Sequence, residues 1–153
     1  MEKIHNLTYD FTRGSVTDTV DLIKRKSHLL GKVAYSIFVG VLGTIFIVWF
    51  LTTFLHSHET VKFIPWIMAF NTAVTGYSLL NKTRNHFIHK QIISTVAGAL
   101  NVIIAYTTLN FLFFYAEGEF LLGRWDLILY LIIGIVCSGL GALLAIKYFD
   151  LKK

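Results

Sequence analysis

The stretch NKTRNHFIHK (residues 81–90) is the only strongly polar break near the middle of the chain, and two long apolar segments lie on each side of it. It contains Lys82, Arg84 and Lys90 and no acidic residue. Basic residues in short loops concentrate on the cytoplasmic side of a membrane. This stretch, called the hinge below, is therefore predicted to lie on the cytoplasmic face between two pairs of membrane spans.

The composition is that of a membrane protein. Of the 153 residues, 55% are hydrophobic, and the mean hydropathy is +0.63. Crossing the core of a bilayer takes about 20 apolar residues. Stretches of that length occur four times, at about residues 33–55, 61–80, 91–116 and 127–146. We therefore predict an all-α integral membrane bundle, in which four transmembrane helices form two antiparallel hairpins.

Residues 1–32 precede this four-helix transmembrane domain of residues 33–153. Residues 1–14 are polar and are predicted to form an irregular cytoplasmic tail. Ser15 and Asp18 have the spacing of a helix N-terminus, and apolar residues then recur at helical intervals beside a basic cluster. Residues 15–30 are predicted to form an amphipathic helix on the membrane surface. The alternative is that they extend the first span as a solvated helix end.

The distribution of Lys and Arg predicts the orientation. Of 14 such residues, only Lys62 and Arg124 fall on the outer side, and the other twelve lie on the side of the hinge and termini. Both termini are therefore predicted to be cytoplasmic, in the cell (inner) membrane. Because the net charge of +5 is gathered beside the spans, we expect membrane lipids as partners and no nucleic acid.

The sequence contains no pattern that predicts catalysis. Serine hydrolase elbows, zinc protease motifs, P-loops and dinucleotide fingerprints do not occur. His56, His58 and Glu59 offer metal-binding side chains, but a structural zinc site needs about four ligands, and no further ligand is evident nearby. We predict a non-enzymatic protein without a metal or other cofactor.

Three asparagines fall inside the spans: Asn71, Asn101 and Asn110. In lipid such amides hydrogen-bond across helices, while small residues, such as Gly134, Ser138 and Ala142 in the fourth span, allow close backbone approach. These residues predict helix packing, with a hydrophilic groove for a lipid headgroup as the alternative. The apolar interiors of the spans contain no Asp, Glu, Lys, Arg or His, which disfavours an ion-coupled transporter.

The hinge also contains an R-N-x3-H pattern, formed by Arg84, Asn85 and His89. It resembles the short motif of HEPN ribonucleases, and the resemblance would make Arg84 and His89 a cleavage pair. That motif belongs on a helix of a soluble domain, whereas here it lies in a connector between spans. The alternative is that these residues are basic anchors on a membrane-surface turn.

The two halves of the chain look like distant copies. The first and third spans contain FVGVLGT (38–44) and VAGALNV (96–102), and the second and fourth end in LLNKTRNHF (79–87) and LLAIKYFDL (143–151). This arrangement resembles the GtrA-like family of small four-span proteins, although Gly43 replaces an asparagine of that family. The resemblance implies handling of polyprenyl-phosphate-linked sugars for envelope glycosylation. It would place a lipid phosphate near Asn81, Lys82, Arg84, Phe87 and Lys90.

We therefore expect a polytopic membrane protein that assists translocation of a polyprenyl-phosphate-linked sugar. One alternative is an oligomeric membrane pore, or an accessory protein of a CRISPR-associated defence system or a toxin system. Another is a structural subunit of a larger membrane complex. Glycine-rich helix faces would support self-association in these cases.

Overall fold

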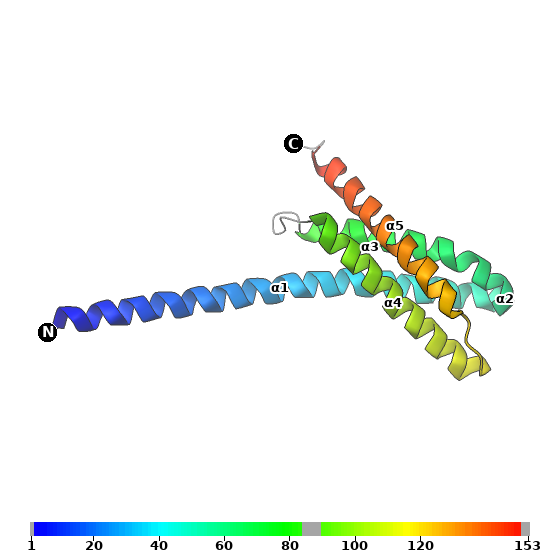
Figure 1. Cartoon of the computed structure of the whole chain (residues 1–153), viewed down its shortest axis with the longest axis horizontal. Coiled ribbons are helices and arrows are strands. Elements are labelled where there is room, and N and C mark those ends of the chain that lie inside the picture. Colours follow the sequence, from blue (N-terminus) through cyan, green and yellow to red (C-terminus); the bar gives the residue numbers. More distant parts are fainter. Residues whose placement is uncertain (1, 84–89, 151–153) are drawn as a thin grey trace. The chain divides into compact units, whose positions relative to one another are not determined.

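The computed structural model describes residues 2–83 and 90–150. The chain divides into two units, residues 1–32 and residues 33–153, which are considered separately. Within the described residues every regular element is a helix (Figure 1). The elements are α1 (Glu2–Phe54), α2 (Ser57–Thr60), the short 3-10 helix η1 (Val61–Phe63), α3 (Ile64–Thr83), α4 (Lys90–Glu117) and α5 (Arg124–Asp150).

Four segments of these helices are long and apolar enough to cross a membrane. They are Leu30–Phe54, Ser57–Lys82, Gln91–Glu117 and Arg124–Tyr148. This result confirms the predicted all-helical architecture with four membrane-length helices. It indicates a multi-pass membrane protein.

The N-terminal unit differs from the sequence prediction. Helix α1 begins at Glu2, so residues 2–14 are helical and the predicted irregular tail is wrong. This part of the helix contains one glycine, Gly14. A single glycine inside a helix costs only about 1 kcal/mol relative to alanine, and the only proline of the chain, Pro65, lies elsewhere.

The helix ends have local causes. Helix α4 stops before Gly118, whose φ of 78° is a left-handed conformation that glycine adopts without steric cost. The Gly118 amide donates to the Phe114 carbonyl at 3.0 Å. At the start of α5, the Asp126 carboxylate accepts a 2.8 Å hydrogen bond from the Gly123 amide. This contact satisfies a donor that the helix itself leaves unpaired.

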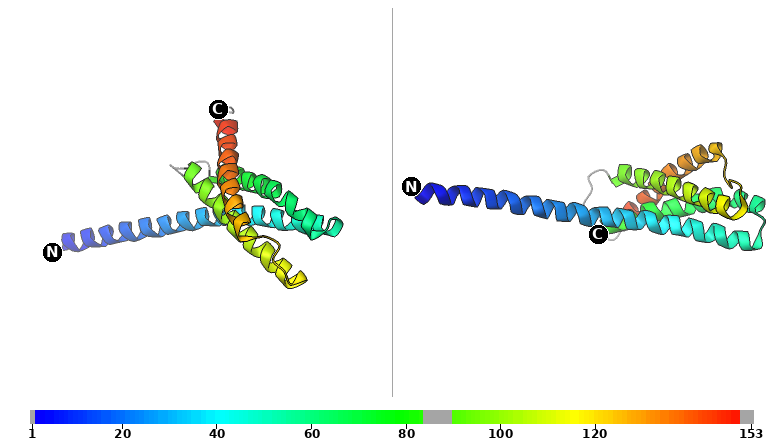
Figure 2. Two further views of the ribbon diagram at one scale, coloured as in Figure 1. Left: turned by 45° about the vertical axis from the view of Figure 1, so that its right-hand side comes forward. Right: turned by 90° about the horizontal axis from the view of Figure 1, so that it is seen from below.

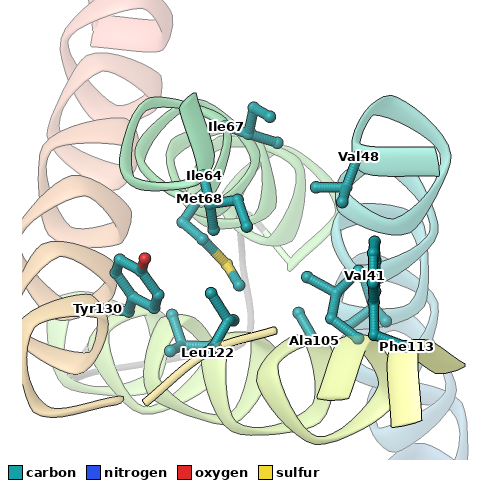
Figure 3. Packing of buried hydrophobic residues seen from close by; sticks show 11 residues of the cluster. Val41, Val48, Ile64, Ile67, Met68, Ala105, Phe113, Leu122 and Tyr130 are labelled. Atoms are coloured by element: carbon teal, nitrogen blue, oxygen red, sulfur yellow. The ribbon is translucent and has the colours of Figure 1, made fainter. Parts of the chain in front are cut away.

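The apolar core of residues 33–153 is built by all four long helices. Val41 and Val48 of α1 face Ile64 and Met68 of α3, together with residues from α4 and α5 (Figure 3). Figure 3 shows Met68 pointing toward Leu122 and Tyr130. In a bilayer the surrounding lipid is as apolar as these side chains, so such contacts stabilise by close packing.

Helices α3, α4 and α5 cross near their middles, as the views in Figure 2 show. Small residues make this crossing possible. A Cβ atom added at Gly76 of α3 would overlap the Ser138 carbonyl of α5, and one added at Gly98 of α4 would overlap the Ser138 side chain. The Ser94 hydroxyl donates to the Ser138 carbonyl at 2.9 Å, and the Ser138 hydroxyl donates to the Ser94 carbonyl at 2.7 Å.

Candidate functional site

The bundle has two ends that differ in chemistry. The end at which α3 and α5 finish and α4 begins is called the hinge end. The end at which α4 finishes and α5 begins is called the loop end. The hydroxyl of Ser57 in α2 donates to the Glu117 carboxylate of α4 at 2.9 Å, so the 55–56 connection also lies at the loop end. Candidate polar sites occur at both ends and at mid-bundle.

At the hinge end, Lys82 contacts an aromatic ring of another helix. Its Nζ lies 3.5 Å from the centroid of the Tyr35 ring in α1. Both Lys82 and the neighbouring Asn81 are exposed. A cation over an aromatic face is stabilised by the ring quadrupole, so this contact holds the last turn of α3 against α1 and fixes the position of one positive charge.

A groove of about 250 Å³ lies at the same end. It is lined by Tyr77 of α3 and by Leu144, Lys147 and Tyr148 of α5. Leu144 is 63% exposed and Tyr148 is 49% exposed. The surface that lines the groove is therefore apolar and includes two aromatic rings, close to the ends of two membrane-length helices.

The predicted phosphate site is represented only in part by the described residues. Asn81 and Lys82 end α3, and Lys90 is the first residue of α4. Arg84 and Phe87, together with His89 of the R-N-x3-H pattern, lie outside the described residues. Sequence analysis missed the tyrosines of the hinge end. A signal was available, because tyrosines near span ends are typical of membrane interfaces. They are Tyr35, Tyr77 and Tyr148.

At mid-bundle, two of the predicted intramembrane asparagines are buried. Asn101 of α4 is 0% exposed and Asn71 of α3 is 6% exposed. The Asn101 Nδ2 donates to the Thr75 hydroxyl at 2.6 Å. That hydroxyl in turn donates to the Asn71 backbone carbonyl at 2.8 Å. The side-chain amide of Asn101 thus joins α4 to α3.

Helix α1 packs directly on these amides. A Cβ atom at Gly40 would overlap Asn101 Nδ2 and the Thr75 hydroxyl, and one at Gly43 would lie 2.8 Å from Asn71 Oδ1. Asn71 Nδ2 and Asn101 Oδ1 have no hydrogen-bond partner within the described part of the chain. Burying an amide atom without a hydrogen-bond partner costs free energy. The side chains of Asn71 and Asn101 therefore contact α1 mainly through close packing and less through hydrogen bonds.

At the loop end, the third predicted asparagine has a different role. The Leu122 amide donates to Asn110 Oδ1 at 2.8 Å, and Asn110 Nδ2 donates to the Leu122 carbonyl at 3.2 Å. The Tyr106 hydroxyl donates to the Gly123 carbonyl at 3.0 Å. Asn110 therefore holds the connection between α4 and α5, because its side chain bonds to both the amide and the carbonyl of Leu122.

Replacing Asn110 with alanine should loosen this connection. Leu122 is buried, so its amide would lose its side-chain partner in a site that water enters poorly, and its carbonyl would keep only the Tyr106 hydroxyl. We expect the free energy of unfolding to fall by about 1–3 kcal/mol. Hydrogen exchange of residues 118–123 should become faster, whereas Thr108→Ala, which removes only a bond to the Ile104 carbonyl of its own helix, should leave it unchanged. Equal exchange in the two variants would contradict this role of Asn110.

The described residues contain no group of three or more His, Cys, Asp or Glu side chains that could hold a metal ion. His56 and His58 are exposed, in and just before the short helix α2. The candidate sites are therefore polar or cationic positions beside apolar surface, which suits amphiphilic ligands better than ions. Comparison of the chain with models of known protein families, with curated proteins and with solved structures finds no match.

Proposed function

We propose that this multi-pass membrane protein binds the phosphate of a lipid carrier at its hinge end and assists translocation of a polyprenyl-phosphate-linked sugar for envelope glycosylation. The observation that carries the proposal is the groove lined by Tyr77, Leu144, Lys147 and Tyr148. Its lining is apolar and aromatic, it lies at the end of two membrane-length helices, and one of its four residues, Lys147, carries a positive charge.

The chemistry of this groove matches the two parts of such a carrier. The Lys147 ammonium group can pair with a phosphate as a point charge. The exposed Leu144 side chain and the two tyrosine rings offer surface to an isoprenoid chain. Lys82, held on the Tyr35 ring, supplies a second positive charge at the same end of the bundle. Asn81, Arg84, Phe87 and Lys90 complete the proposed headgroup site on the evidence of the sequence.

The proposal includes a topology. The four spans form two antiparallel hairpins, and residues 15–30 lie on the membrane surface as an amphipathic helix. Both termini and the hinge face the cytoplasm, because twelve of the 14 Lys and Arg residues fall on that side. The hinge end would then meet the carrier where its sugar is attached, in the cytoplasmic leaflet.

A pore between several copies receives less support. Its lumen would need polar groups, and the mid-bundle side chains of Asn71 and Asn101 are buried within one chain. Asn101 is bonded to Thr75, and both pack against Gly40. They are therefore unavailable to face a lumen between copies. The proposed role is one of binding and moving a lipid, without catalysis.

The test is native mass spectrometry of the protein in nanodiscs that contain a polyprenyl phosphate. We expect the wild type to retain this lipid and Lys147→Gln to lower its affinity about tenfold, because one charge-assisted contact is lost. Lys62→Gln is the matched control, since Lys62 is an exposed lysine in η1, away from the hinge end.

Two outcomes would contradict the proposal. One is equal retention of polyprenyl phosphate by Lys147→Gln and Lys62→Gln. The other is equal retention of the uncharged polyprenol, which would show that the phosphate is not recognised. In cells, loss of envelope glycosylation on deletion should be rescued by the wild type and less well by Lys147→Gln.

A further inference from the structure

A larger groove lies at the loop end, on the opposite side of the bundle from the proposed carrier site. Its volume is about 600 Å³, within the range usual for ligand sites. Its walls come from α4, from the connection to α5 and from the first residue of α5. Three phenylalanines give it an aromatic lining: Phe111, Phe114 and Phe120.

These aromatic side chains are exposed in spite of their size. Phe111 is 68% exposed and Phe120 is 70% exposed. The rings of Phe114 and Phe120 stack on each other at a centroid distance of 5.0 Å, which fixes one wall of the groove. Because this wall is already formed, a ligand that enters the groove loses little binding free energy to reorganisation of the protein.

One cation stands among the residues that line this groove. Arg124, the first residue of α5, is exposed, and no ion pair to it is found in the described part of the chain. The other polar groups of the groove are already engaged. Asn110 binds the Leu122 backbone and Tyr106 donates to the Gly123 carbonyl. The guanidinium is therefore the group left to recognise a ligand.

Two nearby carboxylates are occupied by other donors. Glu117 accepts from the Ser57 hydroxyl, and Asp126 accepts from the Gly123 amide. Glu119 is exposed on the connection. A guanidinium presents two parallel N–H donors that match the geometry of a phosphate, so a phosphate ester is the complementary partner for Arg124.

The expected level of the groove in the membrane agrees with a phosphate ester as the partner of Arg124. Trp125 is 83% exposed beside Arg124, and Tyr115 is 87% exposed beside Phe114. Exposed tryptophan and tyrosine at span ends mark the level of the headgroups. We therefore expect Arg124 to lie at the level of the lipid phosphates, beside the aromatic surface of the groove.

We propose that this groove binds one phospholipid of the surrounding bilayer, with its phosphate on Arg124 and an acyl chain against Phe111 and Phe114. The site is distinct from the carrier site at the hinge end and does not depend on the proposed function. Its occupant would hold the connection between α4 and α5 and the start of α5 against the membrane surface.

The experiment is native mass spectrometry of the full chain, released gently from nanodiscs of dioleoyl phosphatidylglycerol without polyprenyl phosphate. We expect one phospholipid to stay bound to the wild type. Arg124→Gln should lower its affinity about tenfold, and Arg124→Lys should lie between the two, because an ammonium group cannot form the bidentate pair. Phe111→Ala should also release the lipid.

Matched controls separate this site from general lipid contact. Lys62→Gln removes the other predicted outer cation, and Phe70→Ala removes a side chain of α3 that is 65% exposed, close to the exposure of Phe111. Both should retain the lipid as the wild type does. The proposal is overturned if the wild type retains no phospholipid, or if Arg124→Gln and Lys62→Gln retain it equally. Lys147→Gln should leave this lipid bound, so the two proposals can fail separately.

Discussion

Replacing Gly141 with alanine is expected to destabilise the bundle by about 3 kcal/mol, at the upper end of the usual cost of overpacking. A Cβ atom at this position of α5 would overlap the backbone carbonyl of Ala73 in α3. Backbone atoms of a helix cannot rotate away, so the two helices would have to move apart. The measurement is the free energy of unfolding in mixed micelles titrated with denaturing detergent.

Gly139→Ala is the matched control for Gly141→Ala, because it lies two residues away in the same helix. Its added Cβ would meet only a methyl group of Thr95 at 3.6 Å, which is ordinary contact. The alanine also favours the helix by up to about 1 kcal/mol, so this variant should be as stable as the wild type or more so. Equal stability of the two variants would show that α3 and α5 do not cross at Gly141.

Replacing Gly40 with alanine is expected to cost about 2 kcal/mol through a different mechanism. The new Cβ would overlap Asn101 Nδ2 and the Thr75 hydroxyl, which are bonded to each other at mid-bundle. Both groups are side-chain ends and can turn aside. They would then lose their hydrogen bond in a buried apolar place. Unfolding in the same detergent titration measures the loss.

A second substitution should offset part of the stability that Gly40→Ala removes. Asn101→Ala removes one of the two groups that obstruct the new Cβ at Gly40. We therefore expect the double variant to be more stable than the sum of the single effects predicts, by about 1 kcal/mol. Strictly additive effects would contradict the packing of α1 on this amide. Gly31→Ala, where nothing lies within 4 Å of the added Cβ, controls for the change in helix propensity.

The fold class followed from the sequence because it depends on local quantities. Four apolar stretches of about 20 residues are sufficient to predict four membrane-length helices, since only a helix pairs its backbone groups internally at that length in lipid. The helix over residues 2–14 was missed because these polar residues were interpreted as an irregular tail. Asn71, Asn101 and Asn110 were recognised as unusual by the same local reasoning, because an amide inside an apolar run needs a partner.

The partners of these residues were decided by the tertiary structure alone. Asn101 bonds to Thr75, which is 26 residues away, and Asn110 bonds to a backbone connection rather than to a helix. The periodicity of the sequence does not predict such pairings, because they depend on where two helices cross. The crossing is set by where small residues of different helices, such as Gly141 and Ala73, face each other.

The candidate sites were likewise determined in part by the sequence and in part by the tertiary structure. The sequence by itself determined that the hinge is basic. Only the tertiary structure decided that Lys82 lies on Tyr35, that Lys147 shares a groove with Tyr77, and that Arg124 stands beside Phe111. The physical reason is that hydropathy and charge act on each segment separately, whereas a binding groove exists only between side chains that packing brings together from different helices.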